Sequence, residues 1–415
     1  MKIRILVLSG LLLFGLIAKS QNFKSTQGFN KEGVDFNTIT TSVPFLLIGP
    51  DARAGGMGDG GIATSPDANS MHWNPAQYAF IDQKFGLSIS YTPWLRNLVN
   101  DINLAYVSYF NRIGDMQTIA FTMRYFTLGE INFTDENGDP KGTFKPNEFA
   151  IDGTYARKLS ENLSIAVAGR FIYSDLTQGQ YVAGVATRAG ISVAADIALY
   201  WEKDVEWFKS MDATFAWGVN ISNIGNKISY DPSNTKKDFI PTNLRVGPRL
   251  TLFFDEYNKI TFNIDINKLQ VPTPPIYFSK GDTMPGGEIS NGGNDPSNIE
   301  AGKDPDVPPL RGMIQSWYDA PGGFSEELRE FNYAVGIEYW YNDVFALRGG
   351  FFYEDKYKGG RQYATLGVGL RYNAFGLDFS YLIPVSSSQN PLQNTLRFSL
   401  LFNFGHVTKA IDPNG

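Results

Sequence analysis

Fourteen stretches of the chain alternate apolar and polar residues with a period of two, and this pattern constrains the fold more than any other feature. The stretches lie at residues 85–91, 103–110, 117–127, 147–157, 163–174, 188–201, 212–222, 244–254, 260–267, 331–341, 345–354, 362–372, 375–383 and 395–404. Alternation of this kind is typical of β-strands, whose successive side chains point to opposite faces. Most stretches match the roughly 9–11 residues with which a tilted strand crosses a bilayer. The sequence therefore predicts an all-β protein.

The alternation also separates charge from apolar surface. In the third stretch, Ile119, Phe121 and Met123 share one face and Arg124 lies on the other. Mid-strand charges lie repeatedly on that second face: Arg124, Asp152, Arg170, Asp196, Arg249, Asp265, Glu338, Arg348, Arg371, Asp378 and Arg397. An Arg or Lys on a lipid face near the midplane costs about 2–4 kcal/mol, so this segregation fits a lipid-facing exterior and a polar lumen. We interpret these charges as a structural, hydrogen-bonded lumen network.

A soluble β-sandwich also alternates, with its apolar face inside, and three further features favour a membrane barrel. Residues 1–20 read as a signal peptide, with Lys2 and Arg4 before an apolar run and cleavage expected before Gln21. The connectors after the odd-numbered stretches are long or medium, and most of the others are short, as in outer-membrane barrels. The last stretch ends at Phe404, close to the C-terminus.

These features together predict a 14-stranded antiparallel transmembrane β-barrel over residues 85–404, with its N-terminus in the periplasm. An even strand number lets the last strand close against the first, which removes sheet edges that lipid would not tolerate. We expect residues 21–84 to form an N-terminal plug or periplasmic segment and residues 405–415 a periplasmic tail. The Pro- and Gly-rich connector 268–330 predicts a large irregular external loop, with a short helix at 325–330. A loop of this length is either functional or disordered, and both interpretations stay open.

The sequence offers little support for catalysis or metal binding. The chain has no Cys and two His, His72 and His406, which lie far apart in sequence. Gly56, Gly58 and Gly61 match a dinucleotide fingerprint but lack the strand and helix that such a site needs. The acidic run 135–139 has the wrong glycine position for a calcium loop. We therefore predict no metal, no cofactor and no enzyme activity, and the acidic mature chain argues against nucleic-acid binding.

Residues 48–76 read IGPDARAGGMGDGGIATSPDANSMHWNPA. This segment resembles the N-terminal signature of the PorV (LptO) family of the type IX secretion system of Bacteroidota, and more loosely that of the FadL fatty-acid transporters. The residues that carry the resemblance are Gly49, Pro50, Asp51, Ala52, Arg53, Gly55, Gly56, Gly58, Trp73, Asn74 and Pro75. The resemblance implies a 14-stranded barrel with an N-terminal plug. The small residues would let the plug pack in the lumen, and Trp73 to Pro75 would end it before the first strand.

The resemblance to PorV implies a role in protein export. Such a barrel would receive cargo with a C-terminal secretion signal from the translocon barrel protein and deliver it to a cell-surface sortase, which performs the catalysis. The external surface would contact outer-membrane lipid. The alternative is a FadL-like transporter of fatty acids or other hydrophobic molecules. Five inward apolar residues keep it open, since they could line a pocket: Phe126, Phe253, Trp340, Phe352 and Leu382.

Overall fold

A computed structural model describes residues 37–93, 101–134, 140–179, 181–182, 185–206, 211–385 and 395–406. The predicted signal peptide, the acidic run 135–139 and most of the predicted C-terminal tail lie outside the described residues.

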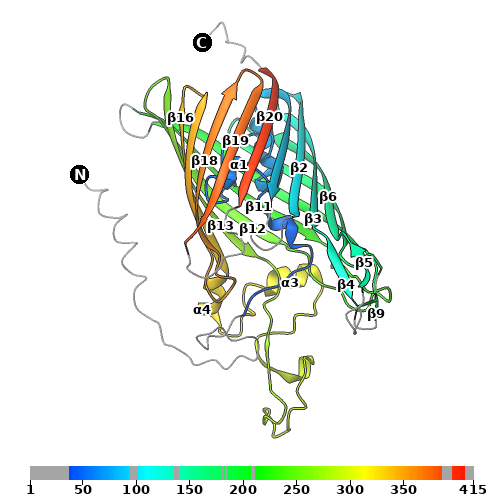
Figure 1. Cartoon of the computed structure of the whole chain (residues 1–415). Helices are drawn as coiled ribbons and strands as arrows, with labels where there is room; N and C mark the ends of the chain where they lie inside the picture. Colours follow the sequence, from blue (N-terminus) through cyan, green and yellow to red (C-terminus); the bar gives the residue numbers. More distant parts are fainter. Residues whose placement is uncertain are drawn as a thin grey trace, which may run out of the picture.

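Fourteen strands form one closed antiparallel barrel (Figure 1), which confirms the predicted fold class and strand number. The strands are β1 (Gln83–Pro93), β2 (Ile102–Gly114), β3 (Gln117–Leu128), β6 (Asn147–Lys158), β7 (Leu163–Asp175), β10 (Gly190–Glu206), β11 (Asp212–Gly225), β12 (Asn243–Phe253), β13 (Asn258–Leu269), β16 (Phe331–Tyr341), β17 (Phe345–Tyr353), β18 (Gln362–Tyr372), β19 (Phe375–Pro384) and β20 (Leu396–His406). The first strand closes the barrel against the last, with Ser90 opposite Ser399 and Phe85 opposite Phe404. The two phenyl rings stack across this seam with centroids 5.1 Å apart.

The two faces of the barrel wall differ as the alternation predicts. On β10, Ile197 points outward and is 56% exposed, whereas its neighbour Asp196 points into the lumen and is 1% exposed. The outward face carries large apolar side chains on every strand, as a lipid-facing belt requires. Among them are Val107, Phe121, Val167, Val193, Ile264, Val335, Leu366 and Leu400.

The connectors differ in length at the two ends of the barrel. At one end the strands are joined by turns as short as residues 115–116 and 373–374, and we refer to this as the turn end. The opposite end carries the longer connectors, including 226–242 and 270–330, and is the loop end. Two small hairpins extend from the loop end: β4 (Ile131–Thr134) with β5 (Pro140–Phe144), and β8 (Tyr181–Val182) with β9 (Val185–Ala186).

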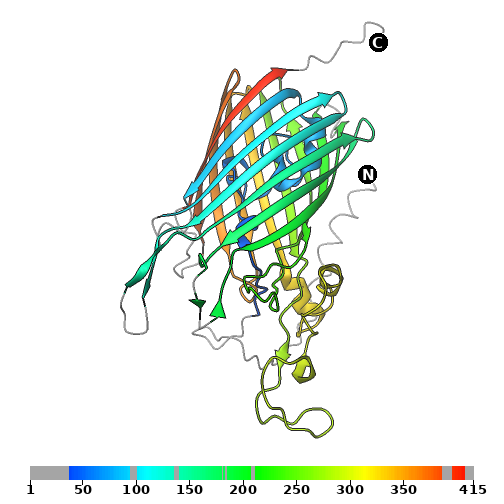
Figure 2. The same cartoon turned by 90° about the vertical axis from the view of Figure 1, so that its right-hand side faces the viewer.

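The connector after β13 projects from the loop end (Figures 1 and 2). It contains β14 (Ile276–Tyr277), η3 (Pro296–Asn298), β15 (Ile299–Ala301), α3 (Pro309–Gln315), α4 (Phe324–Glu327) and η4 (Leu328–Glu330). The helical turns of α4 and η4 lie where a short helix was predicted. The rest of the connector contains further short elements, so it is less irregular than its Pro and Gly content indicated.

The segment before β1 forms four short helices inside the barrel: η1 (Pro44–Leu47), α1 (Ala52–Gly55), α2 (Ser70–Trp73) and η2 (Pro75–Phe80). We call residues 44–80 the plug. In the described part of the chain, no helix has the length and apolar character needed to cross a membrane.

The plug runs through the lumen from the loop end to the turn end. The Asn37 amide donates to the Tyr357 carbonyl (3.2 Å) and the Ser42 amide to the Phe239 carbonyl (3.0 Å), both on loop-end connectors. Gln83 then starts β1 at the turn end, opposite His406. The expectation of an N-terminal segment on the turn side is therefore wrong for residues 37–43. Alternating connector lengths locate the start of the first strand, but they carry no information on the path of the chain before it.

Candidate functional site

The signature identified in the sequence forms the folded centre of the plug, and all eleven of its residues are buried. Asp51 joins its two halves. One carboxylate oxygen accepts the Ala54 amide at 2.9 Å and so caps α1. The other accepts the indole N–H of Trp73 at 2.6 Å. The side chain of Asp51 thus fixes the distance between segments that lie 22 residues apart in sequence.

Asn74 connects α2 to a further helix rather than ending the plug. Its side-chain oxygen accepts the Ala76 amide at 3.0 Å, and Pro75 occupies the first position of η2. Its side-chain nitrogen donates to the carbonyls of Ile62 and Leu199, both at 3.0 Å. The expectation that Trp73 to Pro75 ends the plug is therefore wrong, because Asn74 and Pro75 together are a helix-start signal and the plug continues to Phe80.

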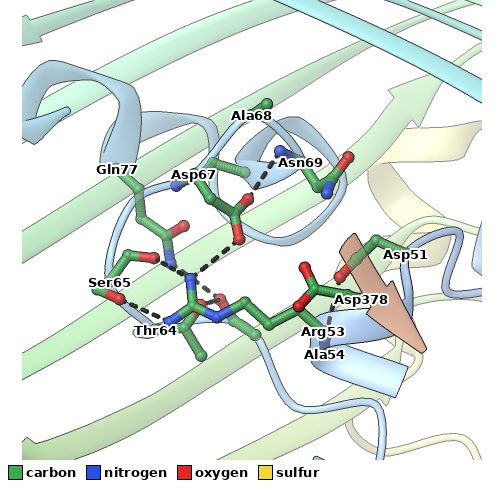
Figure 3. Close-up of polar contacts among 12 residues, drawn as sticks. Asp51, Arg53, Ala54, Thr64, Ser65, Asp67, Ala68, Asn69, Gln77 and Asp378 are labelled. Atoms are coloured by element: carbon green, nitrogen blue, oxygen red, sulfur yellow. Dashed lines mark hydrogen bonds and ion pairs between the residues drawn. The ribbon is translucent and has the colours of Figure 1, made fainter. Parts of the chain in front are cut away.

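Arg53 links the plug to the barrel wall. Its guanidinium binds both carboxylate oxygens of Glu338 on β16, at 2.8 and 3.0 Å. On the plug side it donates to the Asp67 carboxylate at 2.9 Å and to the hydroxyl of Ser65 at 2.6 Å (Figure 3). Five N–H donors in a planar fork allow one arginine to serve both groups.

The ion pair continues along the wall. Glu338 also accepts from Arg348 on β17 at 2.7 Å, and Arg348 donates to Asp378 on β19 at 2.8 Å. Asp378 in turn accepts from Arg371 at 2.7 and 3.0 Å. The Arg371 side chain is 20% exposed. The side chains of Glu338, Arg348 and Asp378 are almost fully buried. Four of the predicted lumen charges therefore form a single network: Glu338, Arg348, Asp378 and Arg371.

A second network lies on β3, β6, β7 and β10. Arg170 binds Asp196 at 3.0 and 3.2 Å and also pairs with Asp152. Arg124 lies 3.8 Å from Asp152 and donates to the Leu46 carbonyl of the plug at 3.0 Å. These four predicted lumen charges thus come together, and one of them contacts the plug directly.

The remaining three predicted charges have separate partners. Asp265 accepts the amides of Gly61 and Ile62 at 2.8 and 2.9 Å, which ties the middle of the plug to β13. Arg397 pairs with Asp59, which also accepts the hydroxyl of Tyr363 at 2.6 Å. Arg249 pairs with Glu202 of β10 at 2.5 Å.

Glycines on both surfaces let plug and wall backbones meet. A Cβ on Gly58 would lie 2.7 Å from the Phe351 backbone, and one on Gly350 would lie 2.2 Å from the Gly58 amide nitrogen. Gly56 and Gly367 face each other in the same way, with a built Cβ 3.0 Å from the opposing Cα. The signature predicted the plug glycines but not their wall partners. Inward-facing glycines in the middle of β17 and β18 are the sequence signal for them.

The five inward apolar residues do not line one pocket. Phe126 stacks on Phe45 of the plug with ring centroids 6.1 Å apart, while Phe352 stacks on Tyr363 in a different cluster that also holds Leu382. Trp340 lies beneath the guanidiniums of Arg348 and Arg371. Phe253 is 37% exposed at the last position of β12. Alternation identifies the face of each residue, but these side chains lie at different depths in the lumen.

His72 lies edge-on to Trp73, with ring centroids 4.6 Å apart. No group of three His, Asp or Glu side chains among the described residues could hold a metal ion. The chemistry that the lumen does provide is hydrogen bonding and ion pairing between plug and wall.

A closed barrel with an apolar outer belt, a polar lumen and a plug held by charge defines an integral outer-membrane β-barrel. Its family is given by the match of residues 31–276, more than half of the chain, to the model described as type IX secretion system protein PorV. The chain belongs to the PorV family. This confirms the resemblance of its signature, and it places the protein in the outer membrane among components of the type IX secretion system.

Solved structures similar to this chain include two toluene transporters and a FadL homologue. The Ralstonia pickettii toluene transporter TbuX is 11% identical, with 86% of this chain and 98% of that chain covered and a TM-score of 0.42. The P. putida toluene transporter TodX is 11% identical, with 87% and 99% covered and a TM-score of 0.44. A Pseudomonas aeruginosa FadL homologue is 10% identical, with 89% and 100% covered and a TM-score of 0.38. No curated protein matches the chain.

Proposed function

We propose that this barrel is a non-catalytic adaptor of the type IX secretion system. It receives cargo with a C-terminal signal from the translocon barrel and presents it to the cell-surface sortase. Barrels of this kind carry their long loops outside the cell, so the loop end is the surface that meets cargo and sortase. Family membership supports a role in the type IX secretion system. The exposed loop end supports binding of cargo and sortase at that surface.

The observation that carries the proposal is an apolar surface on the connector after β13. We call it the loop patch: Leu310, Ile314, Tyr318, Phe324 and Leu328. Leu310 and Ile314 are each 67% exposed, and Phe324 is 77% exposed. Large apolar side chains gathered on one extramembrane connector are typical of a site of protein interaction.

The orientation of α3 is opposite to that of an ordinary amphipathic surface helix. Its buried residues are Gly312 and Gln315, and its apolar residues point outward. A Cβ on Gly312 would lie 2.7 Å from the Phe239 ring, and the Gln315 amide donates to the Asp304 carbonyl at 2.8 Å. These contacts hold the Gly312 and Gln315 side of α3 against two loop-end connectors and leave Leu310 and Ile314 exposed to a partner.

A buried ion cluster anchors the base of the patch. Lys268, at the loop end of β13, binds Glu330 at 2.5 Å and Glu327 at 3.2 Å. Lys358, on the β17–β18 connector, binds Glu326 at 2.6 Å and Glu330 at 3.0 Å. Because all five side chains are largely or fully buried, α4 and η4 are fixed to the barrel rim and form a preorganised platform.

The plugged lumen also supports an adaptor. Plug residues bind wall residues on β13, β16 and β20, and the five apolar side chains that favoured a transporter lie in separate places. The loop patch, in contrast, is exposed outside the barrel wall.

Deletion of the gene tests the proposal. We expect signal-bearing cargo to stay inside the cell or to be released without attachment, and the intact gene supplied in trans to restore attachment. Normal cargo attachment combined with failed uptake of a hydrophobic nutrient would overturn the adaptor and support a transporter.

A further inference from the structure

We propose that the lumen holds one small monovalent anion, of the size of chloride, where the plug meets β3, β7, β11 and β12. A cavity of about 10 Å³ lies there, with His72, Arg124, Arg170, Asn220, Asn223 and Arg245 among its lining residues. A cavity of this size holds a single ligand comparable to a water molecule. The site is independent of the adaptor role.

Unpaired hydrogen-bond donors line the cavity. The imidazole Nδ1 of His72 lies 3.3 Å from Arg124, and because arginine only donates, this nitrogen accepts. The neutral ring then carries its hydrogen on Nε2, which is buried and has no partner within the described residues. The Nε and Nη2 atoms of Arg124 are also buried without a hydrogen-bond acceptor in that part of the chain.

This excess of donors distinguishes an anion from water. A water molecule must donate two hydrogens of its own, and the unpaired buried acceptor among the lining side chains is the Asn220 oxygen. An anion needs no acceptor and would satisfy unpaired donors of the lining residues.

The charges around the cavity are also unequal. Its lining contains three guanidiniums and no carboxylate. Asp152 forms ion pairs with Arg124 and Arg170, and Asp196 forms one with Arg170. Arg245 forms no ion pair within the described residues, since its Nε donates to the amide oxygen of Asn267 at 2.5 Å and its guanidinium lies 4.6 Å from the Trp73 ring centroid. Asp265 and Asp59 act on Arg245 from beyond ion-pair distance, and neither belongs to the lining, so the charges nearest the cavity are those of the three guanidiniums.

The anion would also connect three parts of the structure. His72 belongs to α2 of the plug, Arg124 to β3 and Arg245 to β12. Binding of the ion would fasten the plug to the wall, and the stability of the folded barrel would then depend on the ion's concentration.

Thermal unfolding of the mature protein in detergent tests this inference. Chloride replaces gluconate at constant ionic strength, so that general screening does not change. We expect a saturable rise in Tm for the wild type and, for Arg245→Gln, at least a tenfold weaker apparent chloride affinity. Arg249→Gln is the matched control, because Arg249 is a lumen arginine outside the cavity, and its chloride response should equal that of the wild type. A wild type without a chloride response, or an Arg245→Gln variant with an unchanged one, would overturn the site.

Bromide gives a second readout that needs no variant. Crystals of the wild-type protein grown in bromide should show an anomalous difference peak between His72, Arg124 and Arg245. Density for water alone at this position, without an anomalous signal, would contradict the proposal.

Discussion

Arg53 of the plug and Glu338 of β16, which lie 285 residues apart in sequence, form a two-pronged ion pair inside the barrel. Glu338 is shared with Arg348, so the contact extends into the network of the wall. Both partners are shielded from water, and removal of one partner leaves the other charge buried. This pair is a direct ionic link between the signature and the barrel.

Replacing Arg53 with Gln should loosen the plug without preventing barrel formation. Breaking a buried ion pair costs about 3–5 kcal/mol, and the wall strands keep their own hydrogen bonds. Hydrogen exchange across residues 44–80 measures the effect, and we expect protection there to fall. Arg371→Gln is the matched control, since Arg371 belongs to the same network and donates its hydrogen bonds to the wall residues Leu370 and Asp378. Equal protection of the plug in wild type and Arg53→Gln would contradict this role.

The close approach of Gly350 to the plug gives a second prediction. A methyl group at Gly350 would lie 2.2 Å from the Gly58 nitrogen, whereas one at the adjacent Gly349 would meet no atom closer than 3.5 Å. Gly350→Ala should therefore lower the unfolding free energy by about 1–3 kcal/mol, as overpacking does, and Gly349→Ala should change it much less. Urea unfolding of both variants measures the difference, and similar losses in the two would refute the steric explanation.

The loop segment should respond to pH through Asp319. Burial and the neighbouring carboxylates of Glu327 and Glu330 raise the pKa of Asp319 to about 7 from its ordinary 3.8. A raised pKa means that the packed loop binds this proton more tightly than the open loop. Packing should therefore strengthen as the pH falls from 8 through 7 and weaken as it rises again.

Protection factors for residues 270–330, which correct for intrinsic exchange rates, measure this dependence at pH 6 and pH 8. Asp319→Asn should remove most of it, because the amide cannot ionise. Glu300→Gln, at an exposed position of the same segment, should retain it. An Asp319→Asn variant with the wild-type pH dependence would exclude Asp319 as the source.

The barrel could be predicted from sequence because lipid imposes a rule on every strand. Ile197 must point outward and Asp196 inward, and this local constraint recurs fourteen times. The signature could likewise be recognised, since its small residues and Asp51 lie close together in the chain. These features depend on short-range pattern alone.

The contacts of the plug could not be predicted in the same way. Asp265 with Gly61, and Arg397 with Asp59, join residues more than two hundred positions apart, and no local pattern encodes such a pairing. Alternation also assigns a face but not a depth. For that reason Phe126 and Phe253 share the inward parity, while one packs on the plug and the other ends exposed at the turn end.

The adaptor account is tested most directly by the loop patch. Leu310, Ile314 and Phe324 are replaced together by Ser in the full chain, and the barrel is purified in mild detergent from cells that export cargo. Because these side chains are exposed, the variant should reach the outer membrane at the wild-type level. The account predicts that translocon and cargo no longer co-purify with it and that cargo is released unattached. Undiminished co-purification and normal cargo attachment in this variant would contradict it.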